Sequence, residues 1–125
     1  MIADTTFISH LFRERERAQR GPASAFLAAH RRESVRTSII TVGEVAPIFE
    51  TSRGAWEALS DWTIYRLHPG IADAAADVDR EMMRLGARLG ENDNWIAGFC
   101  RYYRQPVLSL DEGFDRVPGL RRVRY

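Results

Sequence analysis

The chain has no lysine, a single cysteine and three histidines among its 125 residues. All 18 basic residues are arginine, which suits bidentate contacts with phosphate and carboxylate groups, although a GC-rich coding sequence produces the same bias. So few His and Cys residues argue against a structural zinc site. The lone Cys100 cannot form an internal disulfide and lies in an apolar helical pattern. This predicts a buried thiol in a reducing compartment, the cytoplasm.

The sequence also lacks a long hydrophobic run, an internal repeat and a low-complexity segment. No apolar stretch is long enough to cross a bilayer, and the first residues do not have the pattern of a secretory signal peptide. Apolar residues make up 45% of the chain, as in an ordinary folded protein. The length suits one domain, residues 1–125, because no linker divides the chain. The net charge of +1 does not indicate a class of partner.

Hydrophobic patterns and turn residues predict strands that alternate with helices. The alternation predicts an α/β fold with a central, mainly parallel sheet and helices on both faces. The expected strands cover residues 2–3, 35–40, 63–67, 106–110 and 123–125. Two of the expected helices cover residues 55–62 and 71–89, and the others begin after Asp4, Gly21, Thr41 and Asp93.

The sequence also predicts how helices begin. Thr5 or Thr6 is expected to cap the first helix. Thr41 and Glu44 have the spacing of a capping box, in which a threonine and a glutamate three residues later satisfy each other's backbone amides. Asn92 or Asp93 is expected to cap the helix that follows it.

Four acidic residues stand at junctions between predicted elements. Asp4 and Asp111 follow strands, whereas Glu44 and Asp93 open helices. Because strand carboxyl ends and helix N-termini meet at one edge of a parallel sheet, these carboxylates are expected to converge. Such a cluster repels itself unless a cation is bound, and carboxylate and water ligands suit Mg²⁺ or Mn²⁺. Taken locally, capping explains Glu44 as well as a metal role does, and it explains Asp93 better than a metal role does.

Four segments carry a family pattern: residues 2–8, 38–45, 92–97 and 107–114. In this order they resemble the PIN-domain family and, within it, the VapC-type ribonuclease toxins of bacterial toxin–antitoxin pairs. The resemblance covers essentially the whole chain and implies a three-layer α/β/α PIN-like domain. It also implies Mg²⁺- or Mn²⁺-dependent hydrolysis of single-stranded or looped RNA by a water nucleophile. The implied partners are a second copy of the chain and a small VapB-like antitoxin.

The resemblance assigns roles to individual residues. The family's hydroxyl group two residues before the last acid falls on Ser109. Thr6 occupies a position that is often asparagine and would support the site, and Gly113 stands where a second acid is common. The family's catalytic and metal-binding acids fall on Asp4, Glu44, Asp93 and Asp111.

Arginine-rich segments are candidates for holding an RNA backbone. The run from residue 13 to residue 17 is also explained as a solvated helix face. Two other classes of function are a catalytically inactive PIN-like binding or scaffold module, against which the four intact acids argue, and a Mg²⁺-dependent phosphatase or DNA nuclease with a similar set of acids. For the last, the sequence shows neither a nucleophile motif nor a phosphate-cradling glycine loop. The candidate RNA contacts are Arg13, Arg15, Arg17, Arg121, Arg122 and Arg124.

Overall fold

The computed structural model describes residues 1–125 and contains short strands between longer helices. Two of the helical segments, η1 and η2, are 3₁₀ helices. The elements are β1 (Ile2–Ala3), α1 (Thr5–Glu16), α2 (Pro22–Ala29), β2 (Thr37–Ser38), α3 (Ile39–Val45), η1 (Ala46–Ile48), α4 (Ser52–Ala58), β3 (Ile64–Tyr65), α5 (Pro69–Arg84), α6 (Glu91–Tyr103), β4 (Val107–Leu108), η2 (Glu112–Arg116) and β5 (Arg122–Val123).

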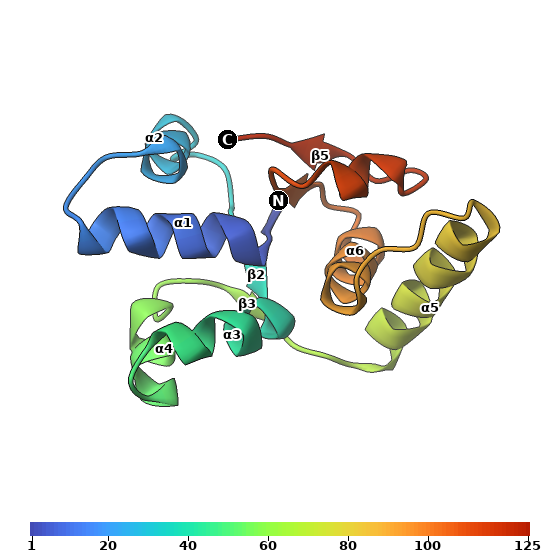
Figure 1. Cartoon of the computed structure of the whole chain (residues 1–125), viewed down its shortest axis with the longest axis horizontal. Helices are drawn as coiled ribbons and strands as arrows, with labels where there is room; N and C mark the ends of the chain where they lie inside the picture. Colours follow the sequence, from blue (N-terminus) through green and yellow to red (C-terminus); the bar gives the residue numbers. More distant parts are fainter.

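Five parallel strands form the centre of the molecule (Figure 1). β1, β4 and β5 form one ladder, with Ile2 opposite Val107, and β2 pairs with β3. A parallel bridge between Ile2 and Arg36 joins the two ladders, and the Ala3 amide donates to the Arg36 carbonyl over 2.7 Å. The strand order is therefore β3-β2-β1-β4-β5. This confirms the predicted α/β fold with a parallel central sheet.

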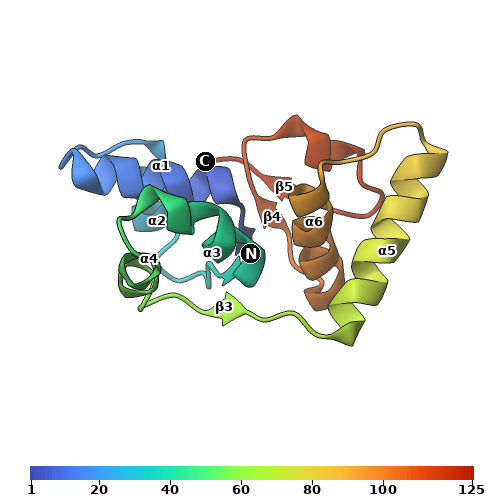
Figure 2. The same ribbon diagram turned by 60° about the horizontal axis from the view of Figure 1, so that its bottom comes forward.

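The two faces of this sheet are covered by different helices. Successive strand side chains point to opposite faces, so Ile2 and Val107 are buried with α5 and α6, whereas Ala3 and Leu108 are buried with α1, α2 and α3. Figures 1 and 2 show α1 to α4 on one side and α5 and α6 on the other. The result is the three-layer α/β/α arrangement that the resemblance implies.

Helices α5 and α6 pack closely through small side chains. A methyl group at Gly98 would lie 2.8 Å from the Ala75 Cβ and 2.9 Å from the Ala75 backbone. Nearby, the side-chain amide of Asn94 donates to the Ala75 carbonyl over 3.0 Å. This contact ties the start of α6 to the middle of α5.

The predicted boundaries of several elements are wrong. The second strand is only Thr37–Ser38, because Ser38 caps α3 by accepting a hydrogen bond from the Thr41 amide and the chain turns into a helix at Ile39. Helix α5 ends at Arg84 and not at residue 89, and Leu85, which follows it, is exposed. Tertiary pairing and caps override local propensity here.

The predicted caps are also wrong. Asp4 caps α1 by accepting a hydrogen bond from the Phe7 amide over 2.7 Å, so neither Thr5 nor Thr6 is the cap. Thr41 lies inside α3, so it cannot form the predicted capping box with Glu44. Gly90 occupies the N-cap position of α6 without a side-chain bond, which leaves Asp93 within the first turn.

No helix of the chain combines the length and the apolar composition that crossing a membrane requires.

Candidate active site

Asp4 is the most deeply buried acid of the chain. It follows β1 and is only 3% exposed. One carboxylate oxygen accepts from the Phe7 amide, and the other accepts from the Ser109 hydroxyl. Burial raises the pKa of Asp4, and the charge of Asp111 raises it further, while the hydrogen bonds from Ser109 and Phe7 oppose the rise. The carboxylate is thus fixed in place but electrostatically unsatisfied.

Glu44 is exposed on α3 but is held from both sides. Its Oε2 accepts from the Thr5 hydroxyl at the start of α1, and its Oε1 accepts from the Asn92 side-chain amide over 2.8 Å. These contacts connect the first turns of α1 and α6 to α3. Glu44 is therefore oriented by two neighbouring elements and not by a capping box.

Asp93 is half-buried in the first turn of α6. Its pKa is raised to about 6, first by burial and then by the charges of Asp111, Glu44 and Asp4. Each of the other three predicted acids therefore lies near enough to oppose the ionisation of Asp93. Its place in the first turn also puts it beside free backbone amides of the helix.

Asp111 follows β4 and caps η2, with its Oδ1 accepting from the Gly113 amide over 2.7 Å. Its own amide donates to the Ser109 hydroxyl over 2.9 Å. A methyl group at Gly113 would stand 3.0 Å from the Asp111 Oδ1, which is tighter than ordinary contact. The glycine that replaces the usual acid therefore gives the Asp111 carboxylate room to turn back over the loop.

The four acids share one edge of the sheet, but they do not form a finished metal cage. No group of three or more Asp, Glu, His or Cys side chains is arranged to hold a metal ion directly. The donor set nevertheless fits Mg²⁺ or Mn²⁺, because all of its atoms are carboxylate oxygens and their mutual repulsion raises the pKa of Asp93. Mg²⁺ keeps several waters and takes one or two carboxylates directly, so it does not need three protein ligands in place.

The supporting hydroxyl groups differ in position. Ser109 is fully buried and bonds to Asp4 and to the Asp111 amide. Thr6 is exposed, and its side chain makes no hydrogen bond. Thr5 and Asn92, which the sequence places only as possible caps, instead hold Glu44. Their positions beside Asp4 and Asp93 were visible in the sequence, but no local signal pairs them with α3.

The candidate RNA contacts fall into two groups. Arg13 and Arg17 line a hollow that also contains Leu110, the neighbour of Asp111, whereas Arg15 lines a different hollow. Arg121 and Arg124 are exposed. The Arg122 side chain is only 6% exposed and forms a two-pronged ion pair with Asp115. Arg122 is thus already neutralised within the chain.

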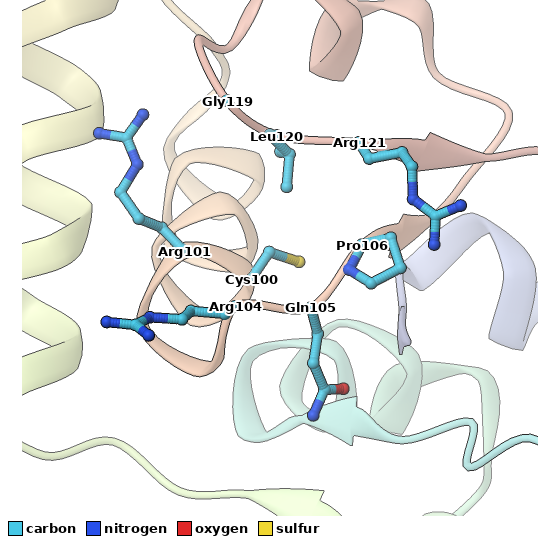
Figure 3. A pocket seen from close by; sticks show the side chains of 8 residues that line it. All are labelled: Cys100, Arg101, Arg104, Gln105, Pro106, Gly119, Leu120 and Arg121. Carbon is cyan, nitrogen blue, oxygen red and sulfur yellow. The ribbon is translucent and has the colours of Figure 1, made fainter.

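A hollow of about 320 Å³ lies at the opposite end of β4, beside Pro106 (Figure 3). No carboxylate lines it, and the Cys100 sulfur points between Pro106 and Leu120. Burial raises the pKa of the Cys100 thiol, so it is no thiolate nucleophile. Arg101, on its rim, is bound to Glu81 and to the Pro118 carbonyl. The lining of this hollow therefore contains no acidic side chain and no ionised thiol.

Comparisons with known proteins agree with this architecture. VapBC2 from Rickettsia felis, bound to a DNA fragment from its promoter, has a TM-score of 0.82 at 14% identity, with 99% of this chain and 97% of that chain covered. FitAcB from Neisseria gonorrhoeae has a TM-score of 0.75 at 20% identity over 97% and 94% of the two chains. VapBC-1 from nontypeable Haemophilus influenzae has a TM-score of 0.71 at 19% identity over 98% and 96%.

These identities are low, and the likeness shows the fold alone. No curated protein sequence matches the chain significantly. The sequence does match the PIN domain over residues 1–120, which is nearly its whole length. The chain therefore belongs to the PIN domain family.

Proposed function

We propose that this chain is a divalent-metal-dependent endoribonuclease and the toxin component of a toxin–antitoxin pair. The observation that carries the proposal is that Asp4, Glu44 and Asp111 lie close to Asp93 at one sheet edge, where burial and these three charges raise the pKa of Asp93 to about 6. A protein that used this edge only for structure would gain nothing from such repulsion. Membership of a family whose members are generally nucleases supports the same conclusion.

Asp4, Asp93 and Asp111 would hold the Mg²⁺ or Mn²⁺ ion, directly or through water, and Glu44 would complete the set or orient the attacking water. When bound, the metal polarises the scissile phosphate and lowers the pKa of that water. Thr5 and Asn92 keep Glu44 turned towards the site. Ser109 fixes Asp4 and, through the Asp111 amide, the loop that carries Asp111.

The proposal includes the partners that the family pattern implies. Several solved structures with this fold are toxin–antitoxin complexes, among them one from Klebsiella pneumoniae. We propose a small cognate antitoxin for this chain, a homodimeric state and action in the cytoplasm. An arginine of the partner reaching the acidic edge would meet the charge that it complements. Coexpression with the adjacent open reading frame and measurement of the mass in solution test these points.

The activity is tested by cleavage of end-labelled total RNA in the presence of Mg²⁺, Mn²⁺ or EDTA. Wild type is compared with Asp93→Asn and with Asp73→Asn, a matched control whose carboxylate is exposed on α5 and makes no ion pair. We expect metal-dependent cutting by wild type and by the control, and a loss of about 100-fold or more in Asp93→Asn. Cutting by Asp93→Asn at the wild-type rate would refute the mechanism.

The alternatives predict other outcomes. A PIN-like scaffold should not cleave RNA and should show no Mn²⁺-dependent rise in its melting temperature. A phosphatase or DNA nuclease should act on mononucleotide esters or DNA but leave RNA intact.

A further inference from the structure

A second hollow lies beside the acidic edge, and we call it the α1 cavity. It has a volume of about 430 Å³, is open to solvent, and is lined by the second half of α1, the link to α2, Leu110 and Tyr125. Figures 1 and 2 both show the C-terminal end of the chain beside α1. Leu110, which precedes Asp111, lines the cavity, and His10 in its wall is close enough to Asp4 to affect that acid's ionisation. The cavity therefore opens next to the candidate active site.

Three arginines line the α1 cavity without a carboxylate partner: Arg13, Arg17 and Arg20. The only acidic side chain in its lining is that of Glu14. Both oxygens of Glu14 are engaged at the start of α2, where they accept from the Ala23 amide over 3.0 Å and the Ser24 amide over 2.7 Å. The negative charge of Glu14 is thus directed at a helix N-terminus, and the cavity keeps an uncompensated positive charge.

The backbone is shaped to bring these groups together. Gly21 is the N-cap of α2 and offers no side chain, and a methyl group there would lie 2.4 Å from the Glu14 Oε1. A side chain at this position would therefore displace the Glu14 carboxylate from the start of α2. After Arg17 the chain turns at Ala18 in the left-handed conformation, with φ of 50°, and so returns Arg20 to the side of α1 that carries Arg17. A non-glycine residue is strained in this conformation.

One wall of the cavity is aromatic. The Tyr125 hydroxyl and the His10 Nδ1 are 2.9 Å apart, and the Tyr125 ring packs edge-to-face on Phe7 at a centroid distance of 4.7 Å. Both wall residues are half-buried, so each is anchored on one side and accessible on the other. A fixed aromatic surface suits a nucleobase, which stacks without regard to sequence, and arginines suit a phosphate.

We propose that the α1 cavity binds one nucleotide of a single-stranded RNA next to the scissile bond, with the phosphate on Arg13, Arg17 and Arg20 and the base against His10 and Tyr125. This inference rests on the proposed function and assigns the substrate-binding side of that site. Arg15 provides the contrast within the same helix, because it faces a different hollow with Leu27 and Trp62.

The test is the affinity for a short fluorescein-labelled single-stranded RNA, measured by anisotropy in EDTA so that binding is separated from cleavage. The double variant Arg17→Gln/Arg20→Gln is expected to bind about tenfold or more weakly. The slope of log affinity against log salt should fall by about 1.4, or about 0.7 for each lost phosphate contact. Arg15→Gln should weaken binding by about twofold at most. Arg32→Gln, an exposed arginine outside the cavity lining, controls for net charge.

The aromatic wall has its own pair of variants. Tyr125→Ala is expected to weaken binding about tenfold, whereas Tyr125→Phe, which keeps the ring and loses the bond to His10, should bind like wild type. Melting temperatures of both variants separate lost packing on Phe7 from lost stacking. A folded Tyr125→Ala variant with wild-type affinity would remove the base from the proposal and overturn it.

Other outcomes separate this inference from the proposed function. RNA cleavage by wild type, together with unchanged binding and cleavage in the cavity variants, would overturn the subsite and leave the nuclease standing. If the wild-type protein binds RNA but never cleaves it, and the cavity variants lose that binding, the subsite would stand and the nuclease would be overturned. Equal losses in Arg15→Gln and in the double variant would show unspecific attraction and overturn the subsite. Binding of a polyglutamate peptide but not of RNA would assign the cavity to an acidic protein segment instead.

Discussion

Ser109 donates a hydrogen bond to Asp4 across the paired strands β1 and β4, although 105 positions separate the two residues. Both residues are buried, and the same hydroxyl accepts the amide of Asp111. One serine thus sets the position of two of the four acids. The bond also lowers the pKa of Asp4 against the larger effect of burial, which raises it.

Ser109→Ala is expected to destabilise the protein by about 1–3 kcal/mol, because it leaves one oxygen of a buried carboxylate without its donor. The pKa of Asp4, already raised, should rise further. An acid whose folded pKa is raised destabilises the fold when it is ionised, so the loss should be largest near neutral pH and shrink as the pH falls. Urea unfolding at neutral and mildly acidic pH measures this. The exposed Ser60→Ala variant is the control, and a loss that does not change with pH would contradict the assignment.

Asp93→Asn is expected to stabilise the metal-free protein. The pKa of Asp93 is about 6 in the folded chain and about 3.9 in an unfolded one, so ionisation disfavours the folded state. The variant should gain about 1–2 kcal/mol above pH 6, and the gain should vanish as the pH falls from about 6 to about 4.

Unfolding in EDTA across this range checks the prediction, with Asp73→Asn as the control. Added Mn²⁺ should stabilise wild type more than Asp93→Asn. Equal stability of the two proteins at every pH would show that the acids do not repel one another as described.

Asn92→Ala is expected to reduce RNA cleavage by about 10- to 100-fold with little effect on stability. Its amide orients Glu44, and the partners that orient functional groups around a metal site typically have effects of this size. Because Asn92 and Glu44 are exposed, the unfolding free energy should change by about 0.5 kcal/mol or less. Cleavage rates and melting temperatures are measured together, with the adjacent Glu91→Gln as the control. Wild-type cleavage by Asn92→Ala would mean that Thr5 alone positions Glu44.

Replacement of two glycines by alanine should change the free energy of unfolding in opposite directions. Gly98→Ala is expected to cost about 1–3 kcal/mol, because its methyl group would meet the Ala75 backbone at 2.9 Å between α5 and α6. Gly43→Ala should stabilise by about 0.5–1 kcal/mol, since Gly43 lies inside α3 with nothing within 4 Å of the added methyl group. Urea midpoints measure both, and stabilisation by Gly98→Ala would contradict the close approach of the two helices.

Local patterns in the sequence were sufficient for the class of fold. Apolar residues at strand and helix spacing predict the alternation of elements, and the buried Phe7 and Leu11 of α1 stand four positions apart, on one face of the helix. The four acids could be identified for the same reason, since each stands where one element gives way to the next. Their convergence at one sheet edge follows from parallel topology alone.

The sequence could not determine the side-chain contacts between residues that lie far apart in the chain. Glu44 is held by residues 39 and 48 positions away, and Asp4 by one 105 positions away. Ser38 took the capping role that the spacing of Thr41 and Glu44 predicted. Caps, strand ends and side-chain partners are decided by differences of about 1 kcal/mol between local alternatives, and the packing of distant segments is large enough to reverse them. The sequence by itself therefore determined which acids meet, and the tertiary structure decided how each of them is held.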